Sequence, residues 1–270
     1  MLCNRDQKGN VSYTYEANEL SAQDILDYWT PERKASAKPA GDWTHDRPCA
    51  LDSVTAATDP QRADTSQMPF QAGGKLFFVR GGEHYVASAS VACSNSLVLT
   101  AAHCVQDNDT GTLCDKFLFE RCYDDGDSAE ELTFRTVALK EYWYESKQWK
   151  WDYAFAVLNG SSTLATPLTY STEDIAGKPL VAYGYPTNYY DGKQMVYING
   201  DAGNTSFGTW EISGDKMRGG SSGGAWVLKD TTTAVGLNSY GPVDPAYAYM
   251  GSPVFDADFD SLYEYVKTLI

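Results

Sequence analysis

The chain has 270 residues, of which 43% are hydrophobic and 13% aromatic, so it can build the core of one large domain or two small ones. Its formal net charge of −15 argues against nucleic acid, whose phosphates require a basic surface, and against anionic membranes. No apolar run approaches the roughly 18 residues that a membrane span needs. We therefore expect neither a nucleic acid nor a membrane as partner.

The first 66 residues are polar and rich in Ala, Asp, Ser, Thr and Pro. They contain one predicted helix, AQDILDYW, which Ser21 caps together with Asp24 three residues later. The following stretch, TPERKASAKPAGDW, contains Pro31 and Pro39 and predicts an extended loop. One short helix cannot make a core alone, so we expect residues 1–66 to fold against the rest of the chain as an N-terminal extension.

From residue 70 the chain consists of short runs rich in Val, Phe, Leu and Tyr, which predict strands. The first series is KLFFVR, HYVASASV, SLVL, DKFLFER, LTFRTVALK and WDYAFAVL, and the second is PLVAYGY, QMVYING, FGTWEIS, GAWVL and TAVGLNSYG. Residues 159–177 connect the two series. We predict an all-β fold of two antiparallel six-stranded barrels, at about residues 70–158 and 175–255, in a domain of residues 67–270.

The chain ends in a segment with helical spacing. Five apolar positions repeat every three or four residues, which predicts a helix over residues 256–268 that packs one face on the body. They are Phe259, Leu262, Tyr263, Val266 and Leu269.

Cysteines and glycosylation signals bear on the compartment. The chain has six cysteines without a CxxC metal pair, and fifteen pairings are possible. The first nineteen residues lack the apolar core of a signal peptide. We nevertheless expect a secreted protein whose signal has been replaced by a start methionine. The cysteines are Cys3, Cys49, Cys93, Cys104, Cys114 and Cys122, and sequons occur at Asn10, Asn108, Asn159 and Asn204.

Three residues far apart in the sequence form a candidate catalytic set. Of the three histidines, His45 and His84 are most simply surface residues, whereas His103 ends the predicted strand in SLVLTAAHCV. Asp152 is a lone carboxylate among apolar residues and needs a partner if it is buried. Ser222 follows in GGSSGGAW. The order His, Asp, Ser is one of the known orders of a catalytic triad.

Each residue type has a role in that chemistry. A serine hydroxyl needs a base to become a nucleophile, a histidine can take its proton, and the aspartate fixes the imidazole tautomer. A glycine–serine run such as MRGGSSGGAW is otherwise typical of a flexible loop. Beside a base the glycines have another purpose, because the backbone amides of Gly220 and Ser222 must both point at one oxyanion.

LTAAHC, DYAFAVL and GGSSGGAW resemble the three signature segments of the chymotrypsin/trypsin-like serine peptidases. The resemblance implies a chymotrypsin-like fold, a nucleophile at Ser222 rather than Ser221, and an endopeptidase activity without a cofactor. GLNSYG resembles the strand that pairs with the substrate backbone through Ser239 and Gly241, next to Asn238 and Tyr240. GKLFF and WTPER are similar to phrases of secreted microbial peptidases related to the glutamyl endopeptidases. By that resemblance, residues 1–66 are expected to be either the pro-region of a zymogen or a retained N-terminal extension.

The chain also departs from that family. Ser221 replaces the usual acidic residue before the nucleophile, and no Ile-Val-Gly-Gly start is present, so activation by a new N-terminal amine is not expected. Asn238 stands where glutamyl endopeptidases have a histidine, so their specificity cannot be transferred. The family's cysteine partner for Cys104 is expected near Ala87 or Ser88, and we predict that Cys93 replaces it.

The resemblance places the base of the primary specificity pocket six residues before the nucleophile, at Lys216. A buried lysine there would favour acidic or polar substrate side chains. A shift of one residue would instead place Asp215 in the pocket and favour basic side chains, and both residues could also form an exposed turn. We favour Lys216 or neither residue at the pocket base.

We therefore predict a secreted, monomeric serine endopeptidase that acts on protein or peptide substrates and uses neither a cofactor nor a metal. The main alternative is a catalytically silent homologue that binds a partner through the old cleft. A second alternative, an esterase of unrelated fold, requires the order Ser, Asp, His, which the chain does not have.

Overall fold

The computed structural model describes residues 1–15, 21–41, 58–204, 208–242, 244 and 246–270. Its helices are α1 (Ala22–Tyr28), α2 (Pro31–Ala35), α3 (Tyr142–Ser146) and α4 (Ala257–Lys267). The strands of the first half are β1 (Leu2–Arg5), β2 (Asn10–Thr14), β3 (Lys38–Pro39), β4 (Gln61–Arg62), β5 (Gly73–Arg80), β6 (Glu83–Val91), β7 (Leu97–Thr100), β8 (Asp115–Arg121), β9 (Glu130–Lys140) and β10 (Ala154–Leu158). Those of the second half are β11 (Thr169–Tyr170), β12 (Pro179–Gly184), β13 (Val196–Asn204), β14 (Thr209–Ser213), β15 (Ala225–Leu228), β16 (Thr233–Leu237) and β17 (Tyr249–Pro253).

The first barrel is closed. Its antiparallel strands follow the order β9, β10, β7, β6, β5 and β8, and β8 pairs again with β9. The alternating runs of the sequence place large aromatic side chains inside it, among them Phe77, Phe119 and Phe155, which are fully buried. Closure leaves no free sheet edge within these six strands.

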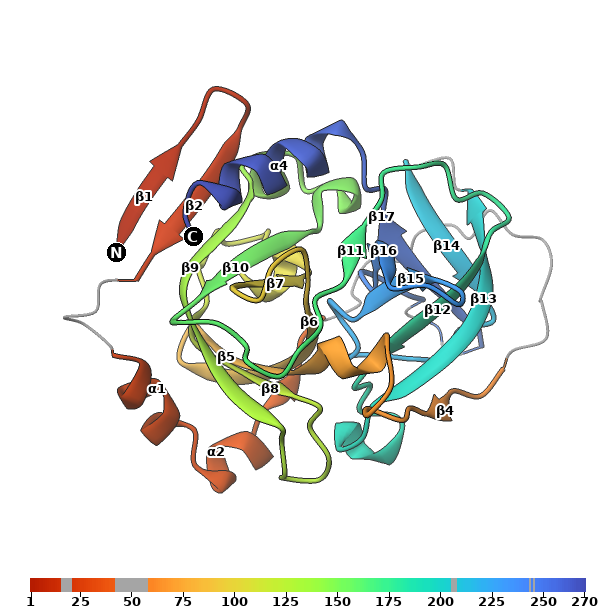
Figure 1. Cartoon of the computed structure of the whole chain (residues 1–270), viewed down its shortest axis with the longest axis horizontal. Helices are drawn as coiled ribbons and strands as arrows, with labels where there is room; N and C mark the ends of the chain where they lie inside the picture. Colours follow the sequence, from red (N-terminus) through yellow and green to blue (C-terminus); the bar gives the residue numbers. More distant parts are fainter. Residues whose placement is uncertain (16–20, 42–57, 205–207, 243, 245) are drawn as a thin grey trace.

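The second half forms another antiparallel sheet, in the order β16, β15, β12, β13, β14 and β17, with β11 added beside β16. Its two ends approach each other where Ser239 N–H donates to Gly251 O at 2.9 Å and Gly251 N–H donates to Tyr240 O at 2.7 Å. The predicted chymotrypsin-like fold of two β units with a C-terminal helix is confirmed (Figure 1). The strand β17 was not among the predicted ones.

The extension contains more regular structure than its composition indicates. The hairpin β1–β2 joins the first sheet, because β2 pairs with β9 over five residues. The predicted helix is confirmed as α1, with the capping box of Ser21 and Asp24 in place. The expected loop after it is wrong in its first half: the Thr30 side chain caps α2 and Pro31 occupies its first turn, where proline is tolerated.

Helix α4 covers one side of the first barrel, and its C-terminus lies near the N-terminal hairpin (Figure 1). Asp256 caps it, and Phe259, Leu262 and Val266 of the predicted apolar face are buried. The ring of Phe259 stacks on Phe255 at 3.8 Å between centroids.

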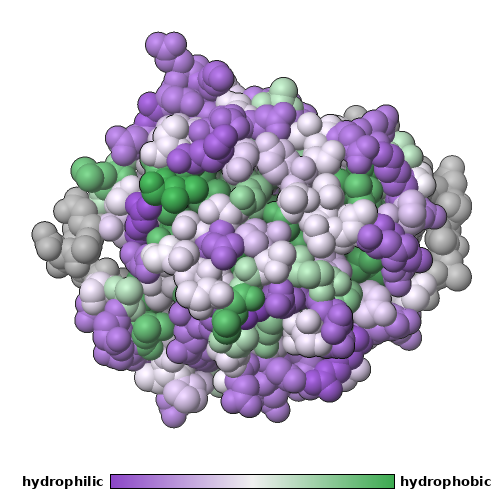
Figure 2. Space-filling view, in the orientation of Figure 1, coloured by the Kyte–Doolittle hydropathy of each residue, from purple (hydrophilic) through white to green (hydrophobic). Residues whose placement is uncertain are grey.

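Figure 2 shows a face of the molecule that is mainly hydrophilic, with small separate apolar areas. No helix in the described ranges is long and apolar enough to cross a membrane.

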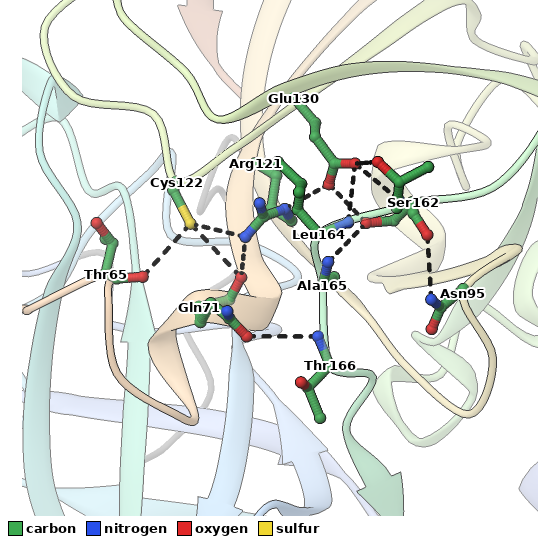
Figure 3. A network of polar contacts seen from close by, with 11 residues as sticks. Thr65, Gln71, Asn95, Arg121, Cys122, Glu130, Ser162, Leu164, Ala165 and Thr166 are labelled. Carbon is green, nitrogen blue, oxygen red and sulfur yellow. Dashed lines mark hydrogen bonds and ion pairs between the residues drawn. The ribbon is translucent and has the colours of Figure 1, made fainter.

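A polar network fixes the connection between the two halves (Figure 3). The Glu130 carboxylate accepts hydrogen bonds from Arg121 Nε at 2.7 Å, Ser162 Oγ at 2.5 Å and the Thr163 N–H at 2.8 Å. Burial raises the pKa of Glu130, but the hydrogen bond from Ser162 and the other donors outweigh it and lower the pKa to about 2. Arg121 also donates to Gln71 O at 2.7 Å, so one buried ion pair holds three segments.

Candidate active site

His103 and Asp152 lie side by side because they adjoin paired strands of the first barrel. His103 lies in the turn Ala102–Cys104 directly after β7, and Asp152 lies just before β10. These strands are antiparallel neighbours, with Ala154 opposite Thr100. His103 Nδ1 is 2.8 Å from Asp152 Oδ2, and the His103 backbone N–H donates to Asp152 Oδ1 at 2.8 Å.

The electrostatics of this pair suit a base. Asp152 is fully buried and also accepts a hydrogen bond from Ser239 Oγ at 2.5 Å. A carboxylate only accepts, so His103 Nδ1 carries the proton and Nε2 is the basic nitrogen. Burial lowers the pKa of His103, but the charges of Asp152 and Cys104 and the hydrogen bonds to them together outweigh it and hold the pKa above its ordinary value of 6.5. Nε2 is buried and has no hydrogen-bond partner among the described residues.

The glycine–serine stretch is a buried loop, since every residue from 219 to 227 is buried. Gly220 has a φ of 96°, and a Cβ there would lie 2.6 Å from the carbonyl oxygen of Tyr185. At Gly224 a Cβ would lie 1.9 Å from the carbonyl oxygen of Tyr183. Only glycine fits at these two positions, so the glycines allow the loop to pack on the end of β12.

The two serines of the loop have different surroundings. Ser221 Oγ donates back to Arg218 O at 2.8 Å, within its own turn. Ser222 O accepts the Ser88 N–H at 2.8 Å, and Ser222 Oγ donates to Ala40 O at 3.3 Å. Ser222 is therefore the serine whose hydroxyl reaches outside the loop.

Ser88 is a residue of the site that the sequence reasoning missed. Its hydroxyl donates to Gly220 O at 2.9 Å and accepts the Tyr185 N–H at 2.9 Å. It thereby joins the glycine–serine loop, residues 219–224, to β6 of the first barrel. The signal was available, because a family cysteine was expected near Ala87 or Ser88 and a polar residue stands there instead.

Asn238 and its neighbours line the loop from the other side. Asn238 is fully buried, its Nδ2 donates to Tyr183 O at 3.0 Å and Ser221 O at 3.1 Å, and its Oδ1 accepts Trp226 Nε1–H at 2.8 Å. These contacts hold the glycine–serine loop against the core of the second β unit. Whether Asn238 also binds substrate stays a prediction.

Tyr240 belongs to an aromatic group beside the histidine. Its ring centroid lies 5.4 Å from that of Trp149, which lies 6.4 Å from the His103 ring. At Gly241 a Cβ would lie 3.2 Å from Tyr249 O, a close approach of two chain segments. The predicted role of Ser239, Tyr240 and Gly241 in substrate binding is compatible with this position next to the base.

The segment proposed for the pocket base is arranged differently from our expectation. Lys216 lies at the surface, and its Nζ forms an ion pair with Asp59 at 2.9 Å, so a buried lysine is not found here. The other favoured possibility, that neither residue forms the pocket base, stays a prediction. Asp215 is fully buried, and its Oδ1 accepts the Met217 N–H at 2.7 Å. Its Oδ2 has no hydrogen-bond partner among the described residues, and burial raises its pKa to about 7. The Arg218 charge lowers that pKa in part.

The cysteines of the described ranges are free thiols, which corrects the predicted bridge between Cys93 and Cys104. Cys93 follows β6 with its N–H bonded to Leu168 O at 2.7 Å, and its sulfur lies near Tyr170. Cys104 instead lies in the turn Ala102–Cys104, next to His103. The remaining described cysteines are Cys3, Cys114 and Cys122, and Cys49 and His45 lie outside the described residues. Within the described ranges, no group of three or more His, Cys, Asp and Glu could hold a metal ion.

Residues 87–237, more than half of the chain, match the family model described as a trypsin-like peptidase domain. The chain therefore belongs to the trypsin-like peptidase family, and its class is that of the serine peptidases.

Solved structures agree with this assignment. The thermostable serine protease AL20 from an extremophilic microorganism is 30% identical, with a TM-score of 0.67 over 74% of this chain and 99% of that protein. Protease Anisep from Arthrobacter nicotinovorans is 26% identical, with a TM-score of 0.66 over 73% and 95%. A Glu endopeptidase shares the fold at 16% identity, with a TM-score of 0.66 over 80% and 100%. A search of curated protein sequences gave no match.

Proposed function

We propose that this chain is a serine endopeptidase that cleaves peptide bonds through His103, Asp152 and Ser222. The observation that carries the proposal is the buried pair of His103 and Asp152, with its 2.8 Å contact and a free basic nitrogen on the imidazole. A buried carboxylate that orients an imidazole in this way is costly to build, and it serves a base.

The steps follow from the chemistry of these groups. Ser222 Oγ attacks the carbonyl carbon of the substrate while its proton passes to His103 Nε2. The negative charge of Asp152 stabilises the imidazolium. His103 then gives the proton to the leaving amine, an acyl-enzyme remains on Ser222, and a water activated by His103 hydrolyses it. The Gly220 and Ser222 amides are proposed to stabilise the oxyanion.

Labelling with a fluorophosphonate tests the proposal directly. The reagent should modify Ser222 in the wild-type chain, and peptide mapping by mass spectrometry would locate the modified residue. Ser221→Ala is a matched control, because it alters the adjacent hydroxyl and should still be labelled. Labelling at Ser221, or at neither serine in a folded chain whose cleft has been opened and that also hydrolyses no peptide, would contradict the assignment.

The alternative is a catalytically silent homologue that binds a partner through the cleft. One observation favours it: Ser222 is buried and its hydroxyl is bonded to Ala40 O rather than to the histidine. The labelling experiment separates the two functions, since a silent homologue would leave every serine unmodified under conditions that open the cleft.

We also propose that the protein is exported, like the secreted microbial peptidases that its sequence resembles. We further propose that it acts as a monomer on protein or peptide substrates. The net charge of −15 supports the proposal that its partners are not polyanions such as nucleic acids. Locating the chain in culture medium or cell extract tests the first point.

A further inference from the structure

The segment Lys38–Ala40 lies directly over the candidate nucleophile, although Ala40 and Ser222 are 182 positions apart in the sequence. Strand β3 pairs in parallel with β6, and the Ala40 N–H donates to Val86 O at 2.7 Å. The Ala40 carbonyl oxygen accepts the Ser222 hydroxyl at 3.3 Å. The extension thus reaches the reacting atom through a short added strand.

The same segment fills the space beside the glycine–serine loop. A Cβ on Gly219 would lie only 2.9 Å from Pro39 Cβ, so the proline ring lies against this glycine. Ala40 and Ser222 are fully buried, and His103 is 7% exposed. A protein substrate therefore has no access to Ser222 in this arrangement.

We propose that Lys38–Ala40 is an intramolecular inhibitory strand, which must leave the cleft before a substrate can enter. The inference rests on the proposed peptidase function and assigns its regulation to the extension.

The contact at Ser222 is unproductive for catalysis. Attack requires the serine oxygen to face a carbonyl carbon while its proton passes to the base. Here the Ser222 proton is directed to the Ala40 carbonyl oxygen, and His103 Nε2 has no partner among the described residues. Ala40 can therefore occupy the site without being attacked.

Helices α1 and α2 hold the strand in place from the side of the first barrel. Trp29 is buried, its Nε1–H donates to Lys116 O at 2.6 Å, and its ring lies 5.5 Å from that of Phe77. Lys34 forms a 2.5 Å ion pair with the buried carboxylate of Glu120. These contacts are independent of the cleft.

His84 adds a third anchor, because both of its ring nitrogens bond to hydroxyls of the extension. Nε2 lies 2.8 Å from Tyr28 Oη and Nδ1 lies 3.0 Å from Ser36 Oγ. By comparison, β3 has only two residues. A two-residue strand has few contacts, so we expect it to open locally while the anchors stay bound.

The test compares Ala40→Glu with Ala35→Glu in the full chain. Ala40 is fully buried directly after β3, so a glutamate cannot fit there without displacing the segment, whereas Ala35 is exposed at the end of helix α2. The readouts are the rate of fluorophosphonate labelling at Ser222 and the hydrolysis of an unfolded fluorescent protein. We expect Ala40→Glu to raise both by up to about tenfold, the factor for full opening of a cleft that is open in roughly one wild-type molecule in ten. Ala35→Glu should match the wild type.

Two further measurements make the outcome decisive. Trp29→Ala loosens the anchor without touching the cleft and should accelerate labelling in the same direction. Hydrogen exchange of the Ala40 amide reports whether the strand has been released. Equal labelling rates in the wild type and a released Ala40→Glu would overturn the inhibitory strand and leave the peptidase proposal intact. No labelling and no hydrolysis in a released, folded Ala40→Glu would overturn the peptidase proposal, and the inhibition with it.

Discussion

The two β units of this chain differ in how several of their carboxyl groups are hydrogen-bonded. In the first barrel, Asp152 accepts three hydrogen bonds, and Glu130 is paired with Arg121. In the second sheet, Asp215 and Glu211 are buried, and each has an oxygen without a hydrogen-bond partner among the described residues. Burial raises the pKa of each of these two carboxyls to about 7, whereas the pKa of Glu130 falls to about 2.

This difference separates the two halves of the candidate site. The proposed base, His103, lies in the first barrel beside a hydrogen-bonded carboxylate, and the proposed nucleophile, Ser222, lies in a loop that is packed by glycines and covered by the extension. Glu120 of the first barrel does not follow this pattern. Its Oε2 has no hydrogen-bond partner among the described residues, burial raises its pKa to about 7, and its ion pair is with Lys34 of the extension.

The largest effects should come from removing either half. Ser222→Ala or His103→Ala should lower kcat by about 10⁶, the scale of losing a triad member in well-studied proteases. Steady-state hydrolysis of a peptide measures it, and circular dichroism controls for folding. Ser221→Ala should keep most of the activity, because its hydroxyl bonds only within its own turn. An inactive Ser221→Ala beside an active Ser222→Ala would reverse the assignment.

Asp152→Asn keeps the shape of the His103–Asp152 pair and removes its negative charge. An amide can donate to His103 Nδ1 and so favour the wrong tautomer, and kcat should fall by about 10⁴. Labelling of Ser222 should slow in parallel. If Asp152→Asn retained near-wild-type kcat, the pair would be structural only.

The pH dependence of activity reports the same pair. The pKa of His103 is raised in the folded state, so the neutral base is present only above that raised value. We expect kcat/KM to fall by about tenfold per pH unit below it. The midpoint should lie above 6.5, the ordinary value for histidine, and Asp152→Asn should move it down. A midpoint at or below 6.5 in the wild type would refute the charge stabilisation.

Glu130→Gln removes the anion of the ion pair between Glu130 and Arg121 in the first barrel. The substitution leaves Arg121 without its anion and should destabilise the fold by about 1–3 kcal/mol at neutral pH, the range for hydrogen bonds to charged groups. The folded pKa is lowered, so the stabilisation is complete above about the ordinary value of 4.5 and is lost as the pH falls toward 2. Urea unfolding at pH 7 and pH 3 measures both. The two proteins should differ less at pH 3.

Asp215→Asn should give the smallest effect, with the opposite sign of pH dependence. The folded pKa is raised, so the wild type loses stability as the pH rises from the ordinary value of 3.8 to about 7, and the amide does not. The variant should therefore be the more stable protein at pH 8, by thermal unfolding. Its cleavage preference in a peptide library should be unchanged. A preference for Lys or Arg that Asp215→Asn abolishes would place this carboxylate in the substrate pocket.

Much of the fold could be predicted because strand alternation and caps are local signals. Each predicted run in the two series became a strand, and the capping box at Ser21 formed as expected. The misses have local reasons too. Thr30 and Pro31 start a helix that the proline pattern concealed, and NVSYT, which forms β2, is a strand signal within a segment of polar composition.

The amino-acid sequence alone supplies the candidate groups, namely one histidine, one lone carboxylate and one serine in an order that suits acyl transfer. Where these groups lie relative to one another depends on contacts between distant segments. Pairing of β7 with β10 joins His103 to Asp152, whereas the contact of Ala40 with Ser222 spans 182 positions. Local patterns record which face of a strand is buried, but they carry no information about which distant segment covers it.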